Sequence, residues 1–166
     1  TGFPESFLFL GQGFRFGVVT AQVLIFAAVA IGVWLLVHRT TFGRTFRAIG
    51  FAPEGAWYAG VPVARRLTLA YVLAGGVAAL AALIYVARVG QAKADAGTGY
   101  ELLAITAVVL GGASIFGGTG TVHGTLLGVV VLAVLKIGLT LSDQPSELAG
   151  ILTGVLLLVV LVGEAL

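Results

Sequence analysis

The sequence predicts an all-α fold, a polytopic integral membrane protein with about five transmembrane crossings and a broken or short helix near residues 102–124. The first observation behind this prediction is a pair of long apolar runs, Val18–His38 and Leu67–Ala87. Neither run contains an acidic residue, a lysine or an arginine. At about 1.5 Å per residue, a helix of that length spans roughly 30 Å, the thickness of a hydrocarbon core. Both runs are therefore expected to cross a membrane.

The second observation is the distribution of arginine between these two runs. The gap at residues 39–66 holds one acid, Glu54, and five arginines: Arg39, Arg44, Arg47, Arg65 and Arg66. Lysine and arginine concentrate in the cytoplasmic loops of membrane proteins. We therefore expect residues 39–66 to form a cytoplasmic loop, the amino terminus to lie outside and the carboxy terminus to lie in the cytoplasm.

Composition agrees with a membrane protein and limits what else the chain can be. Apolar residues make up 59% of it and charged residues 10%, against about 25% charged residues in a typical soluble domain. The basic residues flank apolar runs, so we interpret them as topology signals and expect no nucleic-acid partner. The absence of cysteine excludes disulfides and cysteine nucleophiles. The chain also has no methionine, so we expect a fragment or a processed product.

Three further apolar segments complete the predicted topology. Leu102–Phe116 is short for a crossing, whereas Thr125–Leu141 and Leu148–Gly163 are expected to cross. The acidic turn Ser142–Glu147 contains Pro145, which breaks any helix there. This turn is expected to lie outside.

Two short helices are predicted inside the cytoplasmic loop. The first covers Phe42–Gly50 and is amphipathic, with arginines on one face and Phe42, Phe46 and Ile49 on the other. Gly50 is expected to end it. The second covers Pro53–Ala59, because proline favours the first helical turn and glycine follows the last. These helices are either connectors lying on the membrane surface or a docking element for a cytoplasmic partner.

The run Val108–Gly128 is the richest candidate for a functional motif. Gly112 and Gly117 have the spacing of a phosphate-binding loop, but Gly118 stands where that loop needs lysine. The pairs Gly124/Gly128 and Gly150/Gly154 are interpreted as small faces that let helices pack closely. The remaining residues of the run would break a helix at membrane depth, which is tolerated inside a protein or beside a water-filled pathway. The candidate pathway residues are Gly111, Gly112, Ser114, Phe116, Gly117, Gly118 and Gly120.

Lys136 is the only charged residue inside a predicted crossing. It either extends its amine to the outer membrane surface or lines the pathway. His123 is interpreted as an interfacial histidine, and we expect no metal, no cofactor and no catalytic residues. The chain shows no HExxH motif, no paired carboxylates at helical spacing and no Ser/His/Asp set.

Three blocks, Arg39–Gly50, Gly97–Gly128 and Glu147–Val162, together resemble the membrane-spanning permeases of bacterial ABC importers for monosaccharides. Those permeases are of the ribose, xylose, arabinose and rhamnose type, which includes autoinducer-2 importers. The resemblance implies that residues 1–166 form a single transmembrane permease region, the carboxy-terminal half of a longer permease. It also implies that a coupling helix docks on the ATPase at Pro53, Glu54, Gly55, Ala56, Trp57, Tyr58, Ala59 and Gly60.

The resemblance further implies a function and a set of partners. We expect a permease subunit of an ATP-driven importer that moves a monosaccharide or similar small polar solute into the cell, in the bacterial plasma (inner) membrane. Its partners would be a second permease subunit (in a homo- or heterodimer), a cytoplasmic ATP-binding cassette subunit and a periplasmic or extracellular sugar-binding protein, all at the lipid bilayer. The alternative is an ATP-independent channel or facilitator for a small neutral solute. An intramembrane enzyme is not expected, because no nucleophile is paired with a base.

Overall fold

The computed structural model describes residues 15–16, 19–142 and 146–165, and the chain divides into two compact units. The first unit comprises residues 1–45 and 55–96, and the second comprises residues 46–54 and 97–166. The units meet at three places in the chain: two lie inside the predicted cytoplasmic loop, and the third lies between residues 96 and 97.

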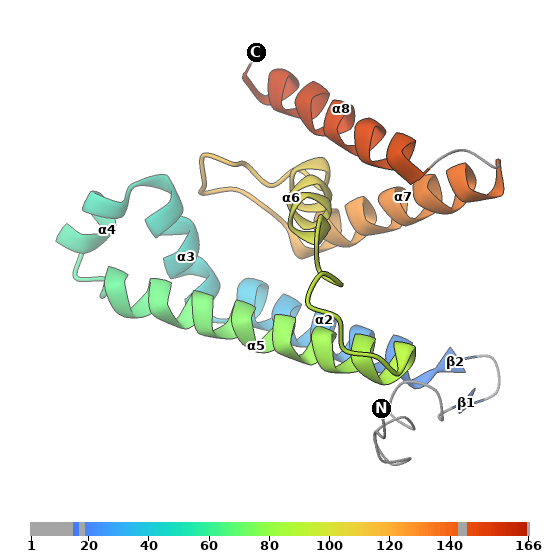
Figure 1. Cartoon of the computed structure of the whole chain (residues 1–166). Helices are drawn as coiled ribbons and strands as arrows, with labels where there is room; N and C mark the ends of the chain where they lie inside the picture. The colour runs from blue at the N-terminus through green and yellow to red at the C-terminus, as the bar shows by residue number, and fades with distance from the viewer. Residues whose placement is uncertain (1–14, 17–18, 143–145, 166) are drawn as a thin grey trace. The chain divides into compact units, whose positions relative to one another are not determined.

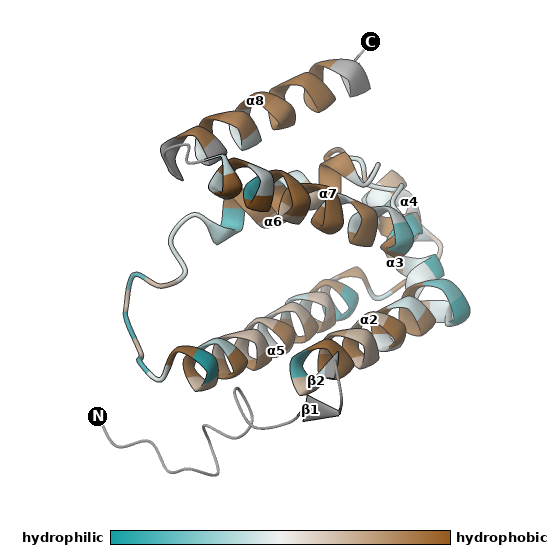
Figure 2. Cartoon of the chain, turned by 90° about the vertical axis from the view of Figure 1, so that its right-hand side faces the viewer, coloured by the Kyte–Doolittle hydropathy of each residue, from teal (hydrophilic) through white to brown (hydrophobic). Residues whose placement is uncertain are grey.

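Two long helices dominate the first unit. A short antiparallel pair, β1 (Arg15–Phe16) and β2 (Val19–Thr20), leads directly into α2 (Ala21–Arg39), and α5 (Val63–Val89) lies beside α2 (Figure 1). Both helices are long and predominantly apolar, and Figure 2 shows mostly apolar or weakly polar residues on the side facing the viewer. The most apolar stretch of each has none of its residues buried within the protein. A helix that is apolar all round and still exposed is stable only when lipid covers it.

The arginine-rich loop folds into α3 (Thr41–Phe51) and α4 (Pro53–Tyr58). The predicted amphipathic character of α3 is confirmed, because Ile49 is buried while Arg44 and Arg47 are exposed. Arg66 of α5 lies over the ring of Phe42, with its guanidinium carbon 4.0 Å from the ring centre. This cation–π contact ties the start of α3 to the start of α5.

The second unit packs three helices, α6 (Tyr100–Leu110), α7 (Val122–Leu141) and α8 (Ser146–Ala165). Each of them contacts the other two. Gly124 of α7 lies so close to the carbonyl of Gly111 that a Cβ atom would overlap it, and Gly128 lies equally close to the carbonyl of Ala107. The predicted close packing at Gly124 and Gly128 is therefore confirmed.

The same interpretation of Gly150 and Gly154 is wrong. A Cβ atom built on either glycine meets nothing within 4 Å. Both residues instead line a cavity between α6, α7 and α8. The spacing of the two glycines is compatible with close packing. Among the described residues, however, no neighbouring helix comes close to the backbone of α8 at these positions.

The predicted fold class is confirmed as an all-α, multi-pass membrane protein, with the two-residue strands as a minor addition. Among the described residues, α2, α5 and α7 are long and apolar enough to span a membrane. With its 11 residues, α6 is about 16 Å long and is too short to cross alone. No helix covers residues 111–121, which separate α6 from α7 and lie inside the predicted break.

Candidate docking and pathway site

The break between α6 and α7, residues 111–121, is called here the glycine segment. It begins because α6 ends in a Schellman motif at Gly112, whose φ is 79°. The Gly112 N–H donates to the Val109 carbonyl at 2.9 Å, and the Ala113 N–H donates to the Val108 carbonyl at 3.1 Å. These two bonds satisfy carbonyls that the end of the helix leaves without partners.

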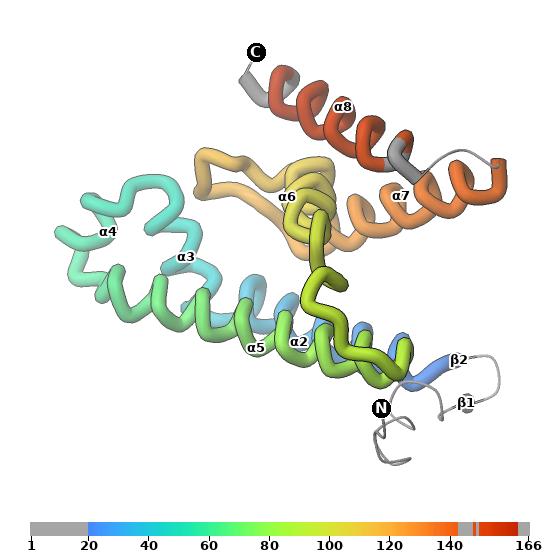
Figure 3. Tube along the Cα trace, in the orientation of Figure 1, coloured from blue at the N-terminus to red at the C-terminus, as the bar shows by residue number. Residues whose placement is uncertain are grey.

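The middle of the glycine segment folds back on itself (Figure 3). The Ser114 N–H donates to the Thr119 carbonyl at 3.2 Å, and the Gly117 N–H donates to the Ser114 carbonyl at 3.3 Å. Gly117 and Gly118 have φ values of 97° and 81°, which side chains oppose. The prediction that these glycines stand in non-helical backbone is thus confirmed, and the exposed ring of Phe116 lies next to them in the turn.

Within the second unit, the tip of the glycine segment rests on the last residues of α3. A Cβ atom on Gly117 would lie 2.8 Å from the carbonyl oxygen of Gly50, and one on Gly50 would overlap the amide nitrogen of Gly118. A Cβ atom on Gly118 would lie 2.8 Å from the ring of Phe51. The predicted end of this helix at Gly50 is therefore wrong, because α3 continues through Phe51 and Gly50 allows close contact between backbones.

The candidate docking helix α4 exposes nearly all of its side chains. Trp57 is 64% exposed and Tyr58 is 81% exposed, with their ring centres 5.0 Å apart, while Ala56 is buried. The helix ends in a second Schellman motif at Gly60, whose φ is 80°. The Gly60 N–H donates to the Trp57 carbonyl and the Val61 N–H donates to the Ala56 carbonyl, at 2.9 and 3.0 Å. The result is a short, well-capped helix with an aromatic pair facing outward.

Lys136 stands apart from the glycine segment. It lies 14 residues after the first residue of α7, which corresponds to roughly 21 Å along the helix axis. It lines the cavity of about 330 Å³ between α6, α7 and α8, whose polar lining also includes the buried side chains of Thr106 and Thr153. The structure therefore brings together the other candidate pathway residues, at 111–120, and does not bring Lys136 to them.

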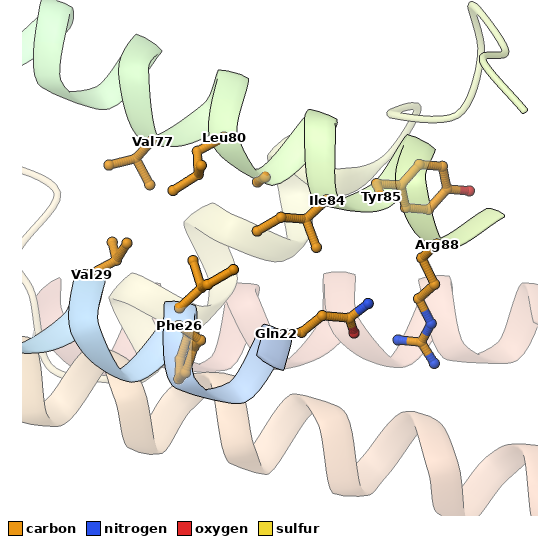
Figure 4. A pocket seen from close by; sticks show the side chains of 10 residues that line it. Gln22, Phe26, Val29, Val77, Leu80, Ile84, Tyr85 and Arg88 are labelled. Carbon is orange, nitrogen blue, oxygen red and sulfur yellow. The ribbon is translucent and has the colours of Figure 1, made fainter. Parts of the chain in front are cut away.

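A second cavity, of about 320 Å³, lies between α2 and α5 in the first unit. Its walls are apolar, and its polar residues are Gln22, Tyr85 and Arg88 (Figure 4). Gln22 is near the start of α2 and Arg88 is near the end of α5. The polar end of the cavity thus coincides with one end of the helix pair.

The description of the family whose model matches residues 1–161 is "branched-chain amino acid transport system / permease component". The chain belongs to this permease family. It is 38% identical over 165 residues to the autoinducer 2 import system permease protein LsrD of Photorhabdus luminescens, a match that covers 99% of this chain and 49% of the relative. The LsrD protein of Yersinia enterocolitica is 39% identical over 165 residues, with 99% of this chain and 50% of the relative covered.

The chain therefore spans about half the length of the curated relatives it matches. No solved structure matches it. Membership of the permease family agrees with the exposed apolar helices of the described residues.

Two residues that contact the glycine segment, Gly50 and Phe51, are not among the site residues predicted from the sequence. The sequence does mark Gly50 as unusual. Glycine is unfavourable in the interior of a helix, yet Gly50 stands inside an otherwise regular amphipathic pattern. A glycine in such a pattern marks either a helix end or a close approach of backbone. The sequence analysis predicts a helix end at Gly50, whereas the structure shows a close approach. Only the three-dimensional structure shows the partner of that approach.

Proposed function

We propose that the chain is part of the permease subunit of an ATP-driven importer in the bacterial plasma membrane, and that α4 is its docking helix for a cytoplasmic ATPase. The observation that carries this proposal is α4 itself. A helix of six residues is too short to be stable alone. Here its carboxy-terminal end is closed by the hydrogen bonds around Gly60, and the helix exposes Trp57 and Tyr58. Exposed aromatic residues on a rigid element are typical anchors of protein interfaces.

Charge supports the cytoplasmic location of α4. The helix lies within the segment that holds five arginines and one acid, and the positive-inside rule assigns such a segment to the cytoplasm. It then follows that the glycine segment, which contacts the end of α3, lies toward the cytoplasmic side. By the same topology the carboxy terminus is cytoplasmic.

The proposed solute is a monosaccharide or a similar small polar molecule. The two LsrD relatives are named for autoinducer 2 import, and the family description names branched-chain amino acids, so the two names differ in solute class. The sequence blocks that resemble monosaccharide permeases, a group that includes autoinducer-2 importers, favour a sugar-like solute over an amino acid. The glycine segment, which includes Ser114 and Thr119, is the proposed pathway element. A second permease subunit and an extracytoplasmic binding protein complete the proposed assembly.

The test is transport by the full-length permease, assembled with its ATPase and binding protein in membrane vesicles. Labelled D-ribose, autoinducer 2 and L-leucine are supplied with and without ATP. We expect ATP-dependent uptake of ribose or autoinducer 2 and none of leucine. Uptake that is independent of ATP would identify the channel or facilitator instead, and uptake of leucine would reject the solute class.

Docking is tested by Trp57→Ala combined with Tyr58→Ala. The double variant should lose co-purification of the ATPase and at least about tenfold in uptake, because interface aromatic residues often contribute 2 kcal/mol or more. Tyr71→Ala is the matched control, since Tyr71 is 78% exposed but lies on α5. If the ATPase remained bound to the double variant, α4 would not be the docking helix.

A further inference from the structure

The contact between α3 and the glycine segment joins two features that the sequence separates by more than sixty residues. Three glycines form it: Gly50 from α3, and Gly117 and Gly118 from the turn. Gly117 and Gly118 need to be glycine for their backbone angles alone. Gly50 does not, because it is helical, and alanine is the better helix former.

Glycine at position 50 is therefore explained by the contact. A Cβ atom there would overlap the amide nitrogen of Gly118 and lie 3.0 Å from its Cα atom. Both neighbours are backbone atoms, so no side chain can rotate away to make room. Phe51 adds to the contact, since its ring lies against the space where a side chain of Gly118 would stand.

The same end of α3 adjoins the docking helix. Only Ala52 separates the last residue of α3 from Pro53, the first residue of α4, and the Ala52 N–H still donates to the Ala48 carbonyl at 3.0 Å. The connection between α3 and α4 is thus a single residue, and that residue is still hydrogen-bonded to the last turn of α3. A displacement of α4 must reach Phe51 and Gly50 within two to three residues, and the glycine segment rests on these two residues.

We propose that the contact of Gly50 and Phe51 with the peptide of Gly117 and Gly118 transmits motion of the docking helix to the glycine segment, with Gly50 as a positioning residue. This inference rests on the proposed function. Packed backbone against backbone passes on a displacement because neither side can absorb it by changing a rotamer. Flexible side chains at the same place would absorb part of it.

The experiment compares Gly50→Ala with Gly75→Ala in the full-length permease assembled with its ATPase. Gly75 is the matched control, because it is also a helical glycine and a Cβ atom there meets nothing within 4 Å. Folded yield, ATPase co-purification, ATP hydrolysis and uptake of autoinducer 2 and D-ribose are measured for each. We expect Gly50→Ala to retain ATPase binding and hydrolysis while uptake per ATP falls at least about fivefold.

Phe51→Ala provides a second, independent variant. It removes the ring beside Gly118 without introducing any overlap, so it loosens the contact and leaves both backbones free to fold. It should also lower uptake per ATP, and Phe51→Leu should restore most of it. Agreement between the two variants would support transmission.

Three results would overturn the proposal. Unchanged uptake per ATP in both variants would show that the contact transmits nothing. Parallel loss of folded yield and uptake would show a structural role only, and loss of ATPase binding would show that the contact merely places α4. Failure of the proposed function is distinguishable, because the parent permease would then itself lack ATP-dependent uptake.

Discussion

Two separate effects favour glycine at position 118, and their contributions to stability can be measured separately. Its φ of 81° disfavours any side chain, and a Cβ atom would lie 2.8 Å from the ring of Phe51. Gly60 has nearly the same φ, 80°, but a Cβ atom there meets nothing within 4 Å. Gly60 therefore isolates the cost of the backbone angle.

Gly60→Ala should lower the free energy of unfolding by about 1–2 kcal/mol, the cost of the left-handed conformation. Gly118→Ala should lower it by roughly 1–3 kcal/mol more, because the overlap with Phe51 adds to that cost. Thermal unfolding of the purified proteins in detergent measures both. Adding Phe51→Ala to Gly118→Ala should recover part of the difference, and equal effects of the two alanines would show that the ring yields freely.

Thr121 is the residue that starts α7. Its side-chain oxygen accepts a hydrogen bond from the Gly124 N–H at 3.1 Å, as the N-cap of a helix does. Thr121→Ala should cost about 1 kcal/mol of stability. Thr140→Ala on the same helix is the control, because the Thr140 hydroxyl only donates to the Lys136 carbonyl, and its removal should cost less than about 0.5 kcal/mol. A loss of equal size in both variants would contradict the capping role.

At the scale of the element, the residues in and next to α4 fall into two groups. One group is buried and holds the helix in place, and the other is exposed and available to a partner. Ala56 is 6% exposed, whereas Ala59, three positions later, is exposed. One alanine therefore anchors the helix and the other is free to face a partner. The docking segment predicted from the sequence included both alanines.

Ala56→Glu should sharply lower the yield of folded permease, because a buried carboxylate with no partner costs several kcal/mol. Ala59→Glu should leave folded yield unchanged and reduce uptake and ATPase co-purification, since the charge falls on the exposed surface. Size-exclusion chromatography in detergent reports the yield, and the vesicle assay reports uptake. Normal yield of Ala56→Glu would mean that Ala56 is not an anchor.

At the scale of the whole molecule, the absence of cysteine makes the topology directly testable. Thr41 and Thr98 are both exposed, and the predicted topology places them on opposite sides of the membrane. A single cysteine at Thr98 should react with an impermeant maleimide from outside intact cells, whereas one at Thr41 should react only after lysis. Labelling of Thr41 in intact cells would invert the topology.

Much of the fold could be predicted from the sequence because membrane helices are defined by local properties. The spans at α2, α5 and α7, the two helices of the arginine-rich loop and the break near Gly117 all followed from runs of apolar residues, arginine placement and glycine. The candidate site was predicted in part. The short helix α4 and the break at the glycine segment were predicted correctly as backbone structure, and their docking and pathway roles stay proposals. The helix end expected at Gly50 was wrong, and Lys136 lies roughly 21 Å along α7 from the residues with which it was predicted to line a pathway.

By itself, the sequence determined that the chain is a multi-pass membrane protein, because length and apolarity decide which segments lipid can cover. It also determined where the backbone must leave the helix, because glycine and proline act within a few residues of their own position. Tertiary structure alone decided which glycines pack closely: Gly50, Gly124 and Gly128 meet neighbouring backbone, whereas Gly150 and Gly154 line a cavity. The physical reason is that a missing side chain leaves room for a neighbour but carries no information about which neighbour fills it.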